Sequence, residues 1–167
     1  MAQTDPIEAI RAADVLFEHA LASFPDDLRA VQPRSGEWSA TEVLSHIATV
    51  ERERYLPQLA AAVHGETLTM TPAPGMQPAP PPPFDVLLAQ YRDDRAEEIA
   101  LLEHVSRDAW TTTTLDHWTY GVIDIHWLAR RMLQHTLDGT QQGLMALNLL
   151  TMGARGREAT PPASLDR

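Results

Sequence analysis

The chain has 167 residues, 44% of them hydrophobic, which is enough for one domain with a substantial core. Its formal net charge is −10, its 13 basic residues are all arginines, and none of them form a large basic cluster, which argues against nucleic-acid binding. There is no cysteine, no run of about 18 apolar residues and no signal peptide at the start, so a cytoplasmic protein without disulfides or membrane spans is expected.

The sequence predicts four long helices, which cover about residues 6–24, 40–63, 84–105 and 122–152. Asp5 is suited to cap the first helix. The second helix begins with Ser39 and Glu42 at the spacing of a capping box. Pro57 should bend this helix and Gly65 should end it. No stretch alternates apolar and polar residues as strands do, so the fold is predicted to be all-α.

A proline-rich linker, residues 66–83, separates the second and third helices, and seven of the 13 prolines lie between Pro72 and Pro83. At about 3.1 Å per residue such a segment reaches roughly 55 Å, which exceeds the roughly 36 Å of a 24-residue helix. The linker therefore allows these helices to run parallel, which predicts an up-down-down-up four-helix bundle. Residues 1–153 are predicted to form this domain, with 154–167 as a flexible tail. A docking site for a domain that reads polyproline is the alternative role of the linker.

Two of the seven histidines, His46 and His135, are expected to face the interior of the bundle. On a helical wheel of about 100° per residue, each lies on the inner stripe of its own helix. Neutral imidazole is a good ligand for zinc, nickel, copper or iron, so the pair is a candidate metal site. Two core histidines satisfied by hydrogen bonds are the alternative. The pocket expected around the pair is lined by Trp38, Glu42, Glu53, Met132, Gly139 and Gln142.

The sequence around both histidines resembles the DinB-like (YfiT-like) superfamily of four-helix bundles. Residues 38–51 read W-S-A-T-E-V-L-S-H-I-A-T-V-E, similar to the W-S-x-x-E-V-L-x-H pattern of that family with an acidic residue soon after. Residues 135–142 read H-T-L-D-G-T-Q-Q, similar to the family's H-x-x-x-H followed by a glutamine. The resemblance covers about residues 5–152. It implies the up-down-down-up bundle and, often, a homodimer.

Members of this family typically hold a divalent metal, commonly zinc or nickel, with three histidines. His46 and His135 match two of them, but Gly139 stands at the third position, so the family's triad cannot form as such. A glycine here either opens space beside the histidines or, with Gly143 four residues further on, allows two helices to approach closely.

Other residues could complete the site in place of the third histidine. Asp138 is the best substitute ligand, and Glu53 or Gln142 could also donate an oxygen. The sequence is equally compatible with a weaker two-histidine site completed by water and with a pocket that holds no metal.

The resemblance implies a divalent-metal-dependent enzyme with a degenerate site, of the thiol-dependent transferase or hydrolase type. A small molecule or a thiol would be its substrate, and the metal would act as a Lewis acid. The alternative is a non-catalytic, stress-associated bundle that has lost the metal and binds a small ligand or a partner. Motifs for a serine nucleophile or a bound nucleotide are missing from the sequence. The lysine-free composition, rich in alanine and proline, is typical of a GC-rich bacterial genome.

Overall fold

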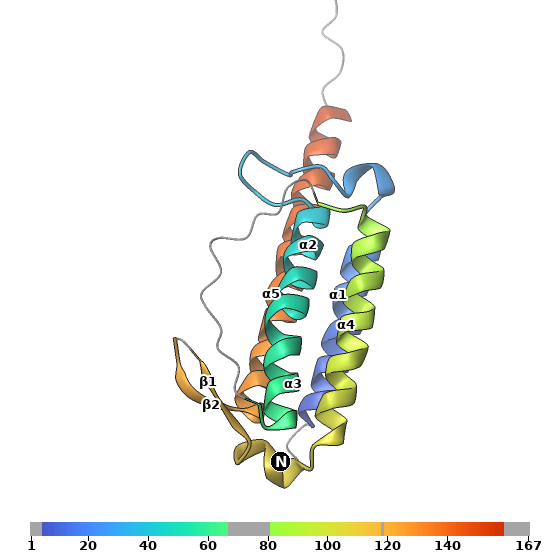
Figure 1. Ribbon diagram of the computed structural model, residues 1–167. Coiled ribbons are helices and arrows are strands. Elements are labelled where there is room, and N and C mark those ends of the chain that lie inside the picture. The colour runs from blue at the N-terminus through green and yellow to red at the C-terminus, as the bar shows by residue number, and fades with distance from the viewer. Residues whose placement is uncertain (1–4, 67–80, 118, 159–167) are drawn as a thin grey trace, which may run out of the picture.

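The structure is a computed structural model that describes residues 5–66, 81–117 and 119–158. It is a four-helix bundle. Three of its columns are single helices: α1 (Pro6–Ala22), α4 (Phe84–His104) and α5 (Ile125–Glu158). The remaining column, between α1 and α4 in the sequence, consists of α2 (Ala40–Val50), the π-helical turn η2 (Glu51–Tyr55) and α3 (Leu56–His64) stacked end to end. In Figure 1, α1 and α5 run upward, whereas the α2–α3 column and α4 run downward. The predicted all-α, up-down-down-up fold is therefore confirmed. Most of the proline-rich linker, residues 67–80, lies outside the described residues.

The helix boundaries follow from local chemistry that the sequence already contained. Asp5 Oδ1 accepts a hydrogen bond from the Ile7 N–H at 2.9 Å, which satisfies a free donor of the first turn of α1. Ser39 and Glu42 form the predicted capping box at the start of α2. The α2–α3 column ends at Gly65, whose φ of 68° is in the left-handed region that glycine adopts without strain.

The middle of the α2–α3 column contains one π-helical turn, and Pro57 follows it directly. Proline has no N–H to donate, so a regular α-helix would leave a carbonyl unpaired at this point. The Leu56 N–H instead bonds to the Glu51 carbonyl, five residues earlier. This turn shifts which residues face inward: Glu51 is fully buried, whereas Glu53 is exposed. The predicted bend at Pro57 is thus accommodated as a π-turn.

A short β-hairpin connects α4 to α5, so the expectation of no strands is wrong at this point. A single-turn helix η3 (Arg107–Thr111) is followed by β1 (Thr114–His117) and β2 (Gly121–Asp124), which pair antiparallel. Leu115 lies opposite Ile123, and both side chains are buried against the end of the bundle. Because residues 122–124 belong to β2, α5 starts later than predicted, and it continues past the predicted end at Gly153.

The core consists of two apolar clusters that lie at opposite ends of the bundle. One contains Ile10, Leu59 and Met132, and the other contains Phe17, Leu44 and Tyr91. Between these clusters, polar side chains from all four columns meet, among them Asp14, Glu51, Arg95 and Thr136. No helix among the described residues is both long and apolar enough to cross a membrane.

Candidate functional site

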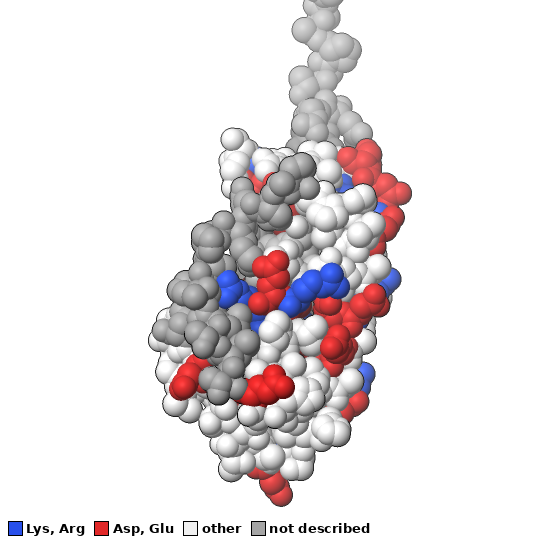
Figure 2. Space-filling model, viewed as in Figure 1, with Lys and Arg blue, Asp and Glu red and all other residues white. Residues whose placement is uncertain are grey.

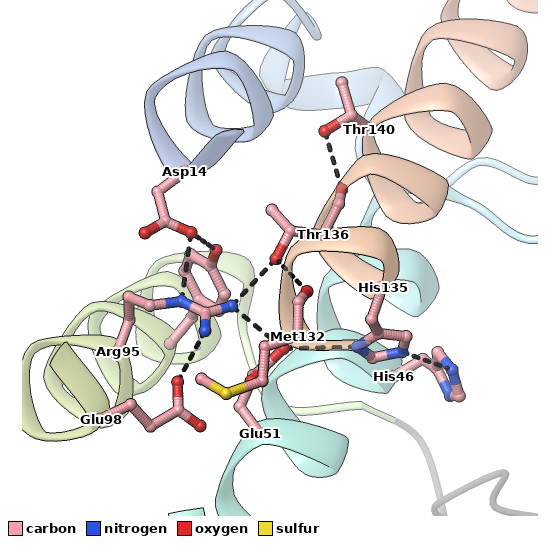
Figure 3. Close-up of polar contacts among 10 residues, drawn as sticks. Asp14, His46, Glu51, Arg95, Glu98, Met132, His135, Thr136 and Thr140 are labelled. Atoms are coloured by element: carbon pink, nitrogen blue, oxygen red, sulfur yellow. Dashed lines mark hydrogen bonds and ion pairs between the residues drawn. The ribbon is translucent and has the colours of Figure 1, made fainter. Parts of the chain in front are cut away.

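The structure brings together the two histidines that the sequence singled out. His46 projects from α2 and His135 from α5, and their Nε2 atoms lie 3.4 Å apart (Figure 3). His135 is 8% exposed and His46 is half-buried. Burial and the neighbouring charge of His135 lower the pKa of His46. His46 therefore favours the neutral imidazole form, which is the form that binds metals.

Glu51 fixes the orientation of His135 from behind. Its Oε1 lies 3.3 Å from His135 Nδ1, so the carboxylate accepts a hydrogen bond from the Nδ1–H tautomer of His135. Figure 3 shows that the Nε2 atom of His135 faces His46, and in this tautomer that nitrogen carries no proton. A carboxylate that holds the far nitrogen of a histidine is the usual outer partner of a metal-binding imidazole. The helical wheel missed Glu51 because it assumed a regular helix, although this residue is the acidic residue of the resembling motif.

Arg95 of α4 organises a buried polar layer between the two apolar clusters. Its guanidinium donates a hydrogen bond to Glu98 Oε2 at 2.7 Å and another to Thr136 Oγ1 at 2.9 Å. It also lies 3.1 Å from Glu51 Oε1 and 3.1 Å from Asp14 Oδ1. Arg95 is 4% exposed, and Glu51 and Glu98 are fully buried. The arginine therefore links α1, the π-turn, α4 and α5 through charges that water does not screen.

The polar layer contains three carboxyl groups and one guanidinium group. Burial raises the pKa of Glu98 well above its usual range, the charge of Glu51 raises it further, and Arg95 opposes both effects. Burial also raises the pKa of Asp14, again against the influence of Arg95. Glu98 therefore favours its protonated, neutral form more than an ordinary glutamate does, which brings the layer closer to neutrality.

Replacing Glu98 with glutamine is expected to leave the fold intact and to change the pH dependence of stability. A carboxyl group with a raised folded-state pKa binds more protons in the folded than in the unfolded chain, so its contribution to stability is lost as the pH rises above about 4.3. Glutamine is neutral at every pH and still accepts from Arg95. In urea unfolding at pH 5, 6 and 7, the free energy of unfolding of the variant should increase relative to that of the wild type as the pH rises. The increase should be at most about 1.4 kcal/mol per pH unit.

The exposed neighbour Glu97 provides the matched control for this measurement. Glu97→Gln makes the same carboxyl-to-amide change on the same helix at an exposed position, and it should change the pH dependence of stability far less. If the free energy of unfolding of Glu98→Gln had the same pH dependence as that of Glu97→Gln, Glu98 would be ionised in the folded protein.

Three carboxylates that the sequence placed near the histidines lie elsewhere. Asp138, the expected third ligand, is exposed and accepts a hydrogen bond from Gln134 Nε2 at 2.8 Å. Glu53 is exposed because the π-turn rotates it outward. The carboxylate of Glu42 accepts hydrogen bonds within the capping box. Among the described residues, no group of three or more potential ligands is placed to hold a metal ion.

Gly139 lies against the α2 helix, so it is a position of close packing. A Cβ atom at this position would lie 2.8 Å from Ile47 Cδ1 and 3.3 Å from Phe17 Cε2. The expectation that the glycine opens space is therefore wrong, because Ile47 fills that space. Close helix–helix approach is supported at Gly139, whereas a Cβ on Gly143 would make an ordinary contact at 3.7 Å.

Two of the remaining predicted pocket residues line a cavity beside the histidine pair. Trp38 and Gln142 border a groove of about 310 Å³, together with apolar side chains that include Val43 and Leu149. Neither histidine lines this groove, but the ring centroid of Trp38 lies 4.8 Å from that of His46, so Trp38 connects the groove to the pair. Met132, by contrast, is completely buried in the apolar core.

The histidine pair fits two neighbouring positions around a divalent metal ion. Two ligands on one tetrahedral zinc, with Zn–N bonds of roughly 2.0–2.1 Å, have their nitrogen atoms about 3.3–3.4 Å apart. The 3.4 Å separation of the two Nε2 atoms agrees with that value. The third histidine of the resembling family has no equivalent, because Gly139 packs on Ile47.

Comparison with solved structures gives two similar four-helix bundles. One is YfiT from Bacillus subtilis, described as "a probable metal-dependent hydrolase with an unusual four-helix bundle topology"; the TM-score is 0.66 at 15% identity, over 89% of this chain and 86% of that chain. The other is TT2238, a four-helix bundle protein, with a TM-score of 0.60 at 15% identity, over 81% of this chain and 93% of that chain. No curated protein matches the sequence. A family model for the DinB superfamily matches residues 9–142, so the chain belongs to the DinB superfamily.

Proposed function

We propose that His46 and His135 form an open divalent-metal site in an enzyme of the hydrolase or thiol-dependent transferase type. The observation that carries the proposal is the 3.4 Å separation of the two Nε2 atoms, with Glu51 behind His135. The description of YfiT as a probable metal-dependent hydrolase supports the same chemistry. Zinc or nickel held here would supply a Lewis acid and lower the pKa of bound water or thiol.

The protein residues have separate roles in this proposal. His46 and His135 would hold the ion, and Glu51 keeps the lone pair of His135 directed toward His46. Arg95 in turn holds the Glu51 carboxyl group in place. The groove lined by Trp38 and Gln142 gives a small substrate a place beside the pair.

Metal content in untagged protein tests the proposal directly. We expect about one equivalent of zinc or nickel per chain after loading and desalting, because one pair of histidines holds one ion. The variant His46→Ala should lose that metal. His104→Ala is the matched control, because His104 is exposed at the end of α4 and should retain it. Elemental analysis by mass spectrometry, with circular dichroism to verify folding, gives the result.

The second candidate function is a metal-free bundle that binds a small ligand, and the packing of Gly139 on Ile47 favours it. The apolar groove beside Trp38 would be its binding site. Metal far below one equivalent, unchanged in His46→Ala and not restored by added zinc or nickel, would exclude the first proposal in favour of this one.

We further propose that the protein forms a homodimer, as the family resemblance implies. Leu137 and Leu144 support this proposal, because they lie two helical turns apart on α5 and are 38% and 41% exposed. Light scattering coupled to size-exclusion chromatography measures the mass, and a monomer at every concentration would contradict the proposal.

A further inference from the structure

A second cavity lies at the end of the bundle near the β-hairpin, away from the histidine pair. It is an open groove of about 690 Å³ between the start of α1, the helix η3 and the first turns of α5. Figure 1 shows this end at the bottom of the view, whereas α2, which contributes Val43 to the other groove, begins at the top. The volume is within the range of about 300–1,000 Å³ that small-molecule sites occupy.

The walls of this groove combine apolar and cationic side chains. Pro6, Ala9 and Leu133 provide the apolar part, and Arg107 and Arg130 provide the positive charges. This composition matches that of ligand sites, in which a mostly apolar lining carries a few polar groups that fix orientation.

Arg107 is held in position by its neighbours. Its guanidinium lies 4.1 Å from the centre of the Trp110 ring and contacts both carboxylate oxygens of Asp5 at 2.8 Å. Trp110 is itself buried and anchored, because its indole N–H donates to the Val105 carbonyl at 3.2 Å. This wall of the groove is therefore pre-formed and needs no ordering when a ligand binds.

Arg130 has no ion-pair or hydrogen-bond partner anywhere in the described part of the chain. The groove therefore carries two arginines against the single acid Asp5, a net charge of +1 in a protein of net charge −10. Elsewhere acids predominate: Figure 2 shows acidic side chains along the right-hand edge, where Figure 1 places α1 and α4. An unpaired guanidinium beside an apolar wall is suited to bind a carboxylate through two parallel hydrogen bonds.

We propose that this groove binds a small monocarboxylate with an apolar body. Arg130 would take the carboxylate and the apolar wall would take the body. One negative charge matches the net charge of the groove, whereas a doubly charged phosphate would exceed it in an acidic protein. The site is separate from the groove beside Trp38, since Gln142 of that groove lies twelve residues further along α5, which is about 18 Å.

Titration of the full-length protein with 2-naphthoate tests this proposal, followed by calorimetry and by ¹H–¹⁵N NMR spectra. We expect the Trp110 indole signal to shift and the Trp38 indole signal to stay unchanged, which separates this site from the proposed metal site. Arg130→Gln should weaken binding at least about tenfold, because it removes a charged hydrogen-bond partner. The matched control is Arg131→Gln, which removes the same charge from the next position outside the groove and should change binding less than about twofold.

Two further probes complete the test. Neutral 2-naphthylmethanol should bind at least about tenfold more weakly than 2-naphthoate, since it lacks the carboxylate. Equal binding of the two compounds, equal effects of Arg130→Gln and Arg131→Gln, or tighter binding of 2-naphthyl phosphate would each overturn the proposal. A Trp110 shift that depends on protein concentration alone would identify the groove as an interface between copies of the chain, which would also overturn it.

Discussion

Replacing Arg95 with methionine is expected to lower the free energy of unfolding by about 3–5 kcal/mol, the range observed when one partner of a buried ion pair is removed. Methionine keeps the unbranched stem of the side chain, so little packing is lost. What is lost is the one cation that faces Glu51, Glu98 and Asp14 in the buried layer. Urea unfolding at pH 7, followed by circular dichroism, measures the change.

The loss of stability caused by Arg95→Met should depend on pH. Without Arg95, the pKa of Asp14 rises further in the folded state, so Asp14 opposes folding more strongly when the pH exceeds its ordinary range. The stability of the variant should therefore approach that of the wild type as the pH falls from 7 to 5. A deficit that is constant over this range would show that lost packing, and not charge, is responsible.

Arg92 provides the matched control for Arg95, because both residues lie on α4 and both contact a glutamate. The side chain of Arg92 is 56% exposed, and its ion pair with Glu18 is at the surface. Exposed ion pairs contribute about 0–1 kcal/mol, so Arg92→Met should have a small effect. Equal effects of the two substitutions would contradict the assignment of the buried layer as an electrostatic unit.

The helical bundle could be predicted from the sequence because its determinants are local. Asp5, the Ser39 and Glu42 capping box and Gly65 each set a helix boundary through their own backbone chemistry, and the structure confirms them. The β-hairpin was missed because each strand has only four residues and only Leu115 and Ile123 face inward, which is too short a pattern for periodicity to detect.

The candidate site could be predicted only in part, because it depends on packing between elements. His46 and His135 were predicted to face inward because each lies on the inner stripe of a regular helical segment, and the structure places them side by side. The prediction named Glu53 instead of Glu51, because a helical wheel of constant pitch does not include the π-turn. Arg95 had no sequence signal at all: a charged residue on a helix with many charges is expected to be exposed, and only the tertiary structure shows its buried partners.

Restoring a histidine at position 139 should require a second substitution, because Ile47 occupies the space. Gly139→His alone is expected to lower the free energy of unfolding by about 1–3 kcal/mol through overpacking. Ile47→Ala alone should lower it by about 2–5 kcal/mol, because it leaves a cavity. The double variant should lose less free energy of unfolding than the two single variants combined, because the imidazole fills the space left by Ile47. The coupling should be about 0.5–3 kcal/mol. Urea unfolding of the four proteins of this cycle measures the coupling.

The double variant should also bind zinc more tightly than the wild type. Residues 135 and 139 are four apart and share one face of α5, so an imidazole at position 139 is placed to join His135 and His46. We expect a gain of at least about tenfold in zinc affinity, the lower limit of what even an outer-shell partner contributes. Gly143→His with Ile47→Ala is the control, because position 143 faces Leu21 and should give no gain. If Gly139→His alone gained as much zinc affinity as the double variant, Ile47 would not be what keeps a third ligand out of this site.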